Sequence, residues 1–326
     1  MARHRITLGL PYHPRTRALI DGEISIDGYE LDITHDPSPG ERHYRFAKGE
    51  WDIGEFSAAT YLRTREQGYR YIALPIFFER GPRQRNIFYC EGKLNHPSEL
   101  KGKKIGCFRY GATAVVWARG YLLDEYALNT TDMQWFVSGQ EVHIGRNLPV
   151  KVERLDPPPP FGQEKPHLSK LLSTGQLHAA LVAGDSGYPG LFGGGVLPQA
   201  MGEFPGVKPL FDDTEAIIRW VRDKRLYPII HLIAMKEEAV ERYPDLPAKL
   251  LEAFREAKKL ATKHLTPEQI EGQEREKAAL GEDPYAYVLG ETEKRTLTAL
   301  ARYQVEQGLL KQPPGLESLF VRCASS

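Results

Sequence analysis

A histidine inside an otherwise apolar segment is the first candidate for acid–base chemistry in this sequence. Six of the seven residues from Ile229 to Met235 are apolar, and the exception is His231. Such a run is typical of a strand buried on both faces, where a polar ring needs a partner. Because imidazole titrates near neutral pH, we predict that His231 transfers a proton. The alternative is a core histidine that is hydrogen-bonded to the backbone.

Glu55 is the second acid–base candidate, because it interrupts a predicted strand just before Ser57. Its carboxyl group could orient His231 or donate the proton itself. A positioned general acid contributes on the order of 10²- to 10⁴-fold to a rate. The alternative is a solvated side chain at the end of a strand.

Three arginines are suited to hold an acidic ligand. Arg83 and Arg85 lie two residues apart on a segment predicted to be extended, so they would share one face. Arg109 lies in a tight polar turn, residues 109–113, between a predicted strand and a predicted helix. The planar guanidinium group gives carboxylates a bidentate contact that lysine cannot match. The alternative is that they are ordinary solvent-exposed arginines.

The turn that holds Arg109 has further features of an anion site. Gly111 allows a tight bend, and we predict that Thr113 caps the following helix with its hydroxyl group. The free N–H groups and the dipole of a helix N-terminus both favour negative charge. The complete set of predicted substrate contacts, all in loops or at strand ends, is Arg83, Arg85, Arg109, Ser57, Gly111, Thr113, Asp185 and His13.

The spacing of potential metal ligands gives no local support for a metal site. The sequence contains ten histidines but no HxH, HxxxH or HExxH pair, so we expect neither a metal nor an organic cofactor. The alternative is a divalent ion held from separate loops by His13, Glu55, Asp185 and His231. Three cysteines without CxxC spacing fit reduced thiols. Cys107 is therefore expected to be a small buried side chain.

Composition limits the class of protein. The 326 residues carry 43 basic and 43 acidic side chains, which gives no argument for binding nucleic acid or an anionic membrane. The N-terminus has no apolar signal-peptide segment, and no run of about 18 apolar residues occurs. We therefore expect a cytoplasmic protein. A homo-oligomer is compatible with the sequence, which does not determine the oligomeric state.

Strands and helices alternate along the chain, which predicts an α/β protein. Residues 11–17 read as a polar turn after the first strand. Strands are expected at 5–10, 28–34, 51–56, 71–78, 86–90, 103–108, 133–137, 150–155, 178–183 and 229–235. Helices are expected at 44–48, from residue 61 onwards, and at 114–126, 168–175, 247–265 and 293–307.

The order of these elements resembles a type II periplasmic-binding-protein fold, in which two α/β lobes hold a ligand in the cleft between them. The motifs that carry the resemblance are Leu8-Gly9-Leu10, Gly49 to Ser57, Leu100 to Gly106, Tyr227 to His231, Asp283 to Tyr287 and Tyr303 to Leu309. The resemblance implies one lobe formed by residues 1–90 with 227–326, and a second lobe formed by residues 91–226.

Within that fold the same motifs are similar to the 4,5-dihydroxyphthalate decarboxylase family, over nearly the whole chain. The resemblance implies a carboxy-lyase that protonates the ring carbon of a hydroxylated aromatic dicarboxylic acid and releases CO2. His231 and Glu55 would handle the proton, and the arginines would hold carboxylates. The alternative is a solute-binding protein for a small acidic ligand. A third alternative is a pyrimidine- or thiamine-precursor-related protein of the same fold, but the sequence contains no cysteine- or histidine-rich motif that supports it.

Overall fold

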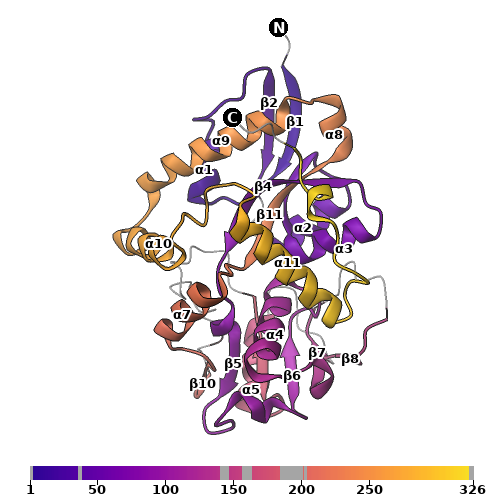
Figure 1. Cartoon of the computed structure of the whole chain (residues 1–326), viewed down its shortest axis with the longest axis vertical. Coiled ribbons are helices and arrows are strands. Elements are labelled where there is room, and N and C mark those ends of the chain that lie inside the picture. Colours follow the sequence, from indigo (N-terminus) through magenta and orange to yellow (C-terminus); the bar gives the residue numbers. More distant parts are fainter. Residues whose placement is uncertain are drawn as a thin grey trace.

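The computed structural model describes residues 3–35, 39–139, 147–155, 164–183, 201 and 204–322. Within them the chain forms two β-sheets, one above the other in Figure 1, with helices around each. This confirms the predicted two-lobed α/β architecture. Among the helices in the described part of the chain, none combines the length and the apolar composition that a membrane span requires.

The first sheet has the strand order β2-β1-β3-β11-β4. β1 pairs in parallel with β2 and β3, whereas β11 pairs antiparallel with β3 and β4. The predicted buried strand around His231 is therefore confirmed, and it joins this sheet from a distant part of the chain. The strands are β1 (His4–Gly9), β2 (Tyr29–Thr34), β3 (Ile53–Ser57), β4 (Tyr71–Arg80) and β11 (Ile229–Lys236).

The second sheet has the strand order β10-β5-β9-β6-β7-β8. Since β5 pairs with β9 and β10, the chain crosses between the lobes before Ile87. The boundary that we predicted at residue 90 therefore falls one strand too late. The strands are β5 (Ile87–Cys90), β6 (Lys104–Cys107), β7 (Gln134–Val137), β8 (Val152–Arg154), β9 (Ala179–Leu181) and β10 (Val207–Pro209).

Helices cover both sheets, and the main predicted ones are present. The polar turn predicted at 11–17 is wrong, because a helix begins at Pro14, a residue well suited to the first helical position. The helices are α1 (Pro14–Ile20), α2 (Pro39–Ala47), α3 (Ala58–Glu66), α4 (Thr113–Tyr126), α5 (Glu164–Ser173), α7 (Thr214–Lys224), α8 (Glu237–Arg242), α9 (Leu246–Ala261), α10 (Pro267–Leu280) and α11 (Glu291–Glu306).

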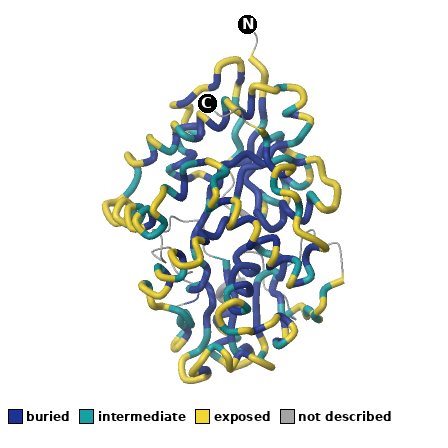
Figure 2. The backbone as a smooth tube through the Cα atoms, in the orientation of Figure 1, coloured by how far each residue is buried: buried dark blue, intermediate teal, exposed yellow. Residues whose placement is uncertain are grey.

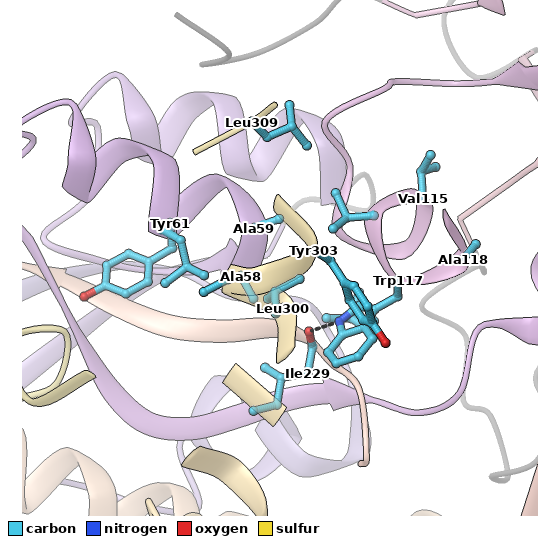
Figure 3. Close-up of a cluster of buried hydrophobic side chains, with 14 of the residues drawn as sticks. Ala58, Ala59, Tyr61, Val115, Trp117, Ala118, Ile229, Leu300, Tyr303 and Leu309 are labelled. Atoms are coloured by element: carbon cyan, nitrogen blue, oxygen red, sulfur yellow. Dashed lines mark hydrogen bonds between the residues drawn. The ribbon is translucent and has the colours of Figure 1, made fainter. Parts of the chain in front are cut away.

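An apolar cluster joins the two lobes, and we call it the junction core. It contains Ala58 of α3, Trp117 of α4, Ile229 of β11 and Leu300 of α11 (Figure 3). The indole Nε1 of Trp117 donates to the carbonyl oxygen of Ile229 at 3.2 Å. Figure 2 shows buried backbone continuing from the upper lobe into the lower one. The two lobes therefore share a hydrophobic core.

A close helix crossing completes the junction core. A Cβ atom on Gly120 of α4 would lie 2.4 Å from the ring of Tyr303 on α11. The absence of a side chain at Gly120 thus allows the two helices to pack closely. The buried Arg119 also donates to the side-chain oxygen of Gln307 at 2.9 and 2.7 Å. These contacts fix the C-terminal part of the chain against the second lobe.

Candidate active site

The register of the first sheet gathers the acid–base candidates on one face. His231 on β11 lies opposite Ser57 on β3, and Glu55 lies opposite Ile233. Since residues two apart in a strand point to the same face, Glu55 and Ser57 share the face of His231. The structure therefore brings together two predicted catalytic residues that are 176 positions apart in the sequence.

A second carboxylate reaches the same face because β4 is irregular. Leu74 lies opposite Ile233, but Glu79 lies opposite His231, so five residues of β4 advance while β11 advances by two. Such bulges re-aim side chains and bend a strand. Pro75 lies in this irregular part, and β4 is at the edge of the sheet, where proline is tolerated. The bulge places Glu79 beside His231.

The imidazole of His231 is held by both carboxylates through a single ring nitrogen. Nδ1 lies 2.9 Å from Oε1 of Glu55 and 3.0 Å from Oε2 of Glu79. Burial opposes the charged imidazolium, but the carboxylates of Glu79 and Glu55 outweigh it and raise the pKa of His231 to about 9. The side chain is 12% exposed. With Nδ1 engaged, Nε2 is the ring nitrogen left for other chemistry.

Glu55 is completely buried and receives a second charged partner from α2. The Nε and Nη2 atoms of Arg42 donate to its Oε2 at 2.8 and 2.6 Å. Burial alone would raise the pKa of Glu55, but His231 and Arg42 hold it well below its usual range. A Cβ atom on Gly54 would lie 2.7 Å from Phe46 of α2. The glycine therefore lets α2 approach β3 closely enough to bring in Arg42.

His43, the residue after Arg42, lies against the same cluster. Its ring is edge-on to that of His231, with centroids 4.6 Å apart, and its Nε2 lies 3.8 Å from Oε2 of Glu55. That nitrogen is buried, and within the described part of the chain it has no hydrogen-bond partner. Burial, and then the charge of His231, lower the pKa of His43 well below its usual range. His43 is therefore neutral.

Three of these side chains have the donor types that a divalent transition metal accepts. Ligand atoms of His43, Glu55 and His231 all lie within 4.8 Å of one another. The guanidinium group of Arg42 already supplies positive charge to the carboxylate of Glu55. Of the predicted alternative set, Glu55 and His231 lie together here, and Asp185 lies outside the described residues. The expectation of no cofactor stays a prediction.

Arg83 and Arg85 do not share a face. Residues Gln84–Asn86 form a short 3₁₀ helix, η1, where we predicted an extended segment. Nη2 of Arg83 donates to Oε1 of Glu79 at 2.7 Å, so Arg83 extends the cluster around His231. Arg85 instead reaches towards α7, where its Nε lies 3.3 Å from a carboxylate oxygen of Asp212. The prediction of a common face is therefore wrong.

Ser57 and Thr113 contact each other across the lobes. Their hydroxyl oxygens lie 2.7 Å apart, and the Thr113 hydroxyl also accepts from the backbone N–H of Ala59 at 3.0 Å. The residue at the N-cap of α4 is Ala112, without a side-chain cap. The prediction that Thr113 caps its own helix is thus wrong, because its hydroxyl is bonded to the start of α3.

The predicted anion turn lies beside α2. A Cβ atom built on Gly40 would lie 3.4 Å from Nη2 of Arg109, and the charge of Arg109 contributes to the lowered pKa of His43 after burial and the larger effect of His231. Arg109 therefore extends from the second lobe towards the cluster in the first. Gly111 lies in the turn between β6 and α4.

His13 is buried, and it caps α1. Its Nδ1 accepts from the backbone N–H of Arg15 at 3.1 Å, and its ring is edge-on to Phe78. Burial, and then the charge of Arg15, lower the pKa of His13 well below its usual range. The contact of His13 with substrate stays a prediction.

Sequence reasoning missed three members of the cluster: Arg42, His43 and Glu79. Arg42 and His43 lie on an amphipathic helix whose start we placed too late, at residue 44. The sequence around Glu79 reads only as the end of a strand, because the bulge in β4 gives no local signal. An Arg-His pair ahead of the Gly-Glu-Phe-Ser strand was the one available clue.

The two-lobed chain, with a buried acid–base cluster where the lobes meet, has the fold of type II periplasmic-binding proteins. The chain resembles the periplasmic aliphatic sulphonate binding protein SsuA from Escherichia coli, with a TM-score of 0.58, 12% identity, and coverage of 98% of this chain and 93% of that one. At this identity the likeness shows the fold alone. No protein-family model matches the chain.

Two curated relatives are more specific. The 4,5-dihydroxyphthalate decarboxylase of Comamonas testosteroni is 31% identical over 276 residues, which cover 82% of this chain and 78% of the relative. That of Pseudomonas putida is 31% identical over 191 residues, 56% of this chain and 71% of the relative. The chain belongs to the 4,5-dihydroxyphthalate decarboxylase family. The predicted family, a family of carboxy-lyases, is therefore confirmed.

Proposed function

We propose that the protein decarboxylates a hydroxylated aromatic dicarboxylic acid such as 4,5-dihydroxyphthalate, by protonating the ring carbon that bears the leaving carboxylate. The observation that carries this proposal is the imidazole of His231, which is held by two buried carboxylates. A histidine kept charged in this way is a proton donor at neutral pH. Membership of the decarboxylase family supports the same reaction.

The chemical step needs one proton and releases one CO2. A ring hydroxyl para to the leaving carboxylate donates electron density, and the ring carbon takes the proton from Nε2 of His231. The carbon–carboxylate bond then breaks, its electron pair restores the aromatic ring, and CO2 leaves. Glu55 keeps Nδ1 hydrogen-bonded throughout. Water then returns a proton to Nε2.

Arginine side chains would hold the carboxylates of the substrate. Arg109 is the foremost candidate, because it extends from the second lobe towards the His231 cluster. Arg83 and Arg85 stay in the proposed set, although each already bonds a protein group. The residues assigned lesser contacts are Ser57, Gly111, Thr113, Asp185 and His13. Closure of the lobes over the substrate would exclude water.

The proposal includes no metal and no organic cofactor, and it places the enzyme in the cytoplasm, as a monomer or a homo-oligomer. Purified protein incubated with 4,5-dihydroxyphthalate, with and without a chelator, tests it by CO2 release and by the ultraviolet spectrum of the product. A rate of CO2 release that is the same with and without the chelator supports the proposal. Thermal stabilisation by the acid without any turnover would instead indicate a binding protein.

A further inference from the structure

The nitrogen Nδ1 of His231 has more hydrogen-bond acceptors than it needs. A neutral imidazole that is oriented through Nδ1–H requires one acceptor. Here a second carboxylate, that of Glu79, lies at 3.0 Å, almost as close as Glu55 at 2.9 Å. Orientation alone is met by Glu55. The second carboxylate therefore calls for a separate explanation.

Each carboxylate has its own arginine on the side away from His231. Arg42 holds Oε2 of Glu55, and Arg83 holds Oε1 of Glu79 at 2.7 Å. Burial alone would raise the pKa of Glu79, but His231 and then Arg83 outweigh it and hold that pKa below its usual range. Both glutamates therefore stay ionised although they are buried. Two negative charges thus face one imidazole.

The other elements packed around His231 do not cancel this negative field. β3 contributes Glu55 and β4 contributes Glu79, while α2 contributes the neutral His43 and the guanidinium of Arg42. Both Arg42 and Arg83 bond the carboxylates rather than the ring. The charge of Arg109 acts on His43, and Arg109 is not among the groups that contribute most to the shifted pKa of His231.

We propose that Glu79 is a positioning residue that keeps His231 in its imidazolium form, so that the proton on Nε2 is always ready for delivery to the substrate ring. This inference rests on the proposed decarboxylase function. Glu55 sets the orientation of the ring, and Glu79 supplies the additional charge that favours protonation. After delivery the ring is a neutral imidazole with its proton on Nδ1, and water reprotonates Nε2.

The substitution Glu79→Gln tests this directly, because it removes the charge and keeps the shape. In the ligand-free protein, the ring nitrogens of His231 are followed by NMR as the pH is raised. We expect His231 to lose its proton at a pH at least one unit lower in the variant. The kcat should fall about tenfold or more at pH 8.5 and less than threefold at pH 6, where Glu55 alone keeps the ring charged.

Two further variants separate charge from structure. Glu79→Asp keeps the charge one methylene away and should give an intermediate titration. Glu237→Gln also removes a glutamate that is paired with two arginines, Arg65 and Arg70, but on α8, and should change neither the titration of His231 nor kcat.

Three results would overturn the inference: an unchanged titration of His231 in Glu79→Gln, an equal loss of kcat at both pH values, or a change confined to KM. The NMR titration requires no turnover. If no aromatic acid is decarboxylated but the titration shifts as expected, the proposed function fails while the relation between Glu79 and His231 stands.

Discussion

The hydroxyl oxygens of Ser57 and Thr113 lie 2.7 Å apart and join the end of β3 in one lobe to the start of α4 in the other. The Thr113 hydroxyl also accepts from the N–H of Ala59. Two residues that we predicted to touch substrate thus touch each other. Their contact lies next to His231, which is opposite Ser57 in the sheet.

Replacing Thr113 by valine should weaken this contact between the lobes. The variant keeps the shape but leaves the N–H of Ala59 and the hydroxyl of Ser57 without this partner. We expect the free energy of unfolding to fall by about 1–3 kcal/mol, as measured by urea denaturation. Thr298→Val on the exposed face of α11 should cost less than about 0.5 kcal/mol. Equal losses in both variants would show that the contact has no stabilising role.

Removing the ring of His231 should separate catalysis from binding. His231→Ala should abolish turnover, because it removes the proposed proton donor, and it should leave the affinity for the acid within about tenfold. Calorimetric titration with 4,5-dihydroxyphthalate measures the affinity. His4→Ala, at the exposed start of β1, serves as control. If the variant loses binding as well as turnover, or does not fold, His231 has a structural role and not a catalytic one.

Arg109→Lys should discriminate between diacids and monoacids. Lysine keeps the charge but loses the planar fork that binds a carboxylate through two hydrogen bonds. If Arg109 holds the second carboxylate of the substrate, the dissociation constant should rise more for phthalate-type diacids than for benzoate-type monoacids. Arg154→Lys on β8 is exposed and should affect neither. Equal weakening of both ligand classes would remove Arg109 from this role.

In a double-mutant cycle, substitutions of the buried pair Arg42 and Glu55 should have strongly non-additive effects on the free energy of unfolding. Removal of one member leaves an uncompensated buried charge, so Glu55→Gln and Arg42→Met should each cost about 3–5 kcal/mol of unfolding free energy. The double variant should cost clearly less than the sum of the two. Urea unfolding of all four proteins completes the cycle. Additive losses would mean that the two side chains act independently.

The strand that carries His231 could be predicted from the sequence, because its run of apolar residues is a local signal. Glu55 could also be predicted as a site residue, since a carboxylate inside a predicted apolar strand indicates a special role. The contact between them could not be derived from local pattern, because it depends on β11 inserting between β3 and β4. The resemblance supplied the fold in which that insertion occurs.

Other parts of the site had no local signal. Glu79 reaches His231 only through the bulge in β4, and a bulge depends on pairing with a strand from far along the chain. Thr113 was expected to cap α4 because threonine does so in many helices. Its hydroxyl bonds Ser57 and Ala59 instead, since the other lobe offers partners that a single-helix argument does not include.

The junction core has a consequence for how the protein melts. Apolar side chains from α3, α4, β11 and α11 form one cluster that belongs to neither sheet alone. Two sheets with separate cores would unfold in separate steps, whereas a shared core couples them into one cooperative transition. Damage to either lobe would then lower the thermal stability of the other. The acid–base cluster would be lost in the same transition as the fold.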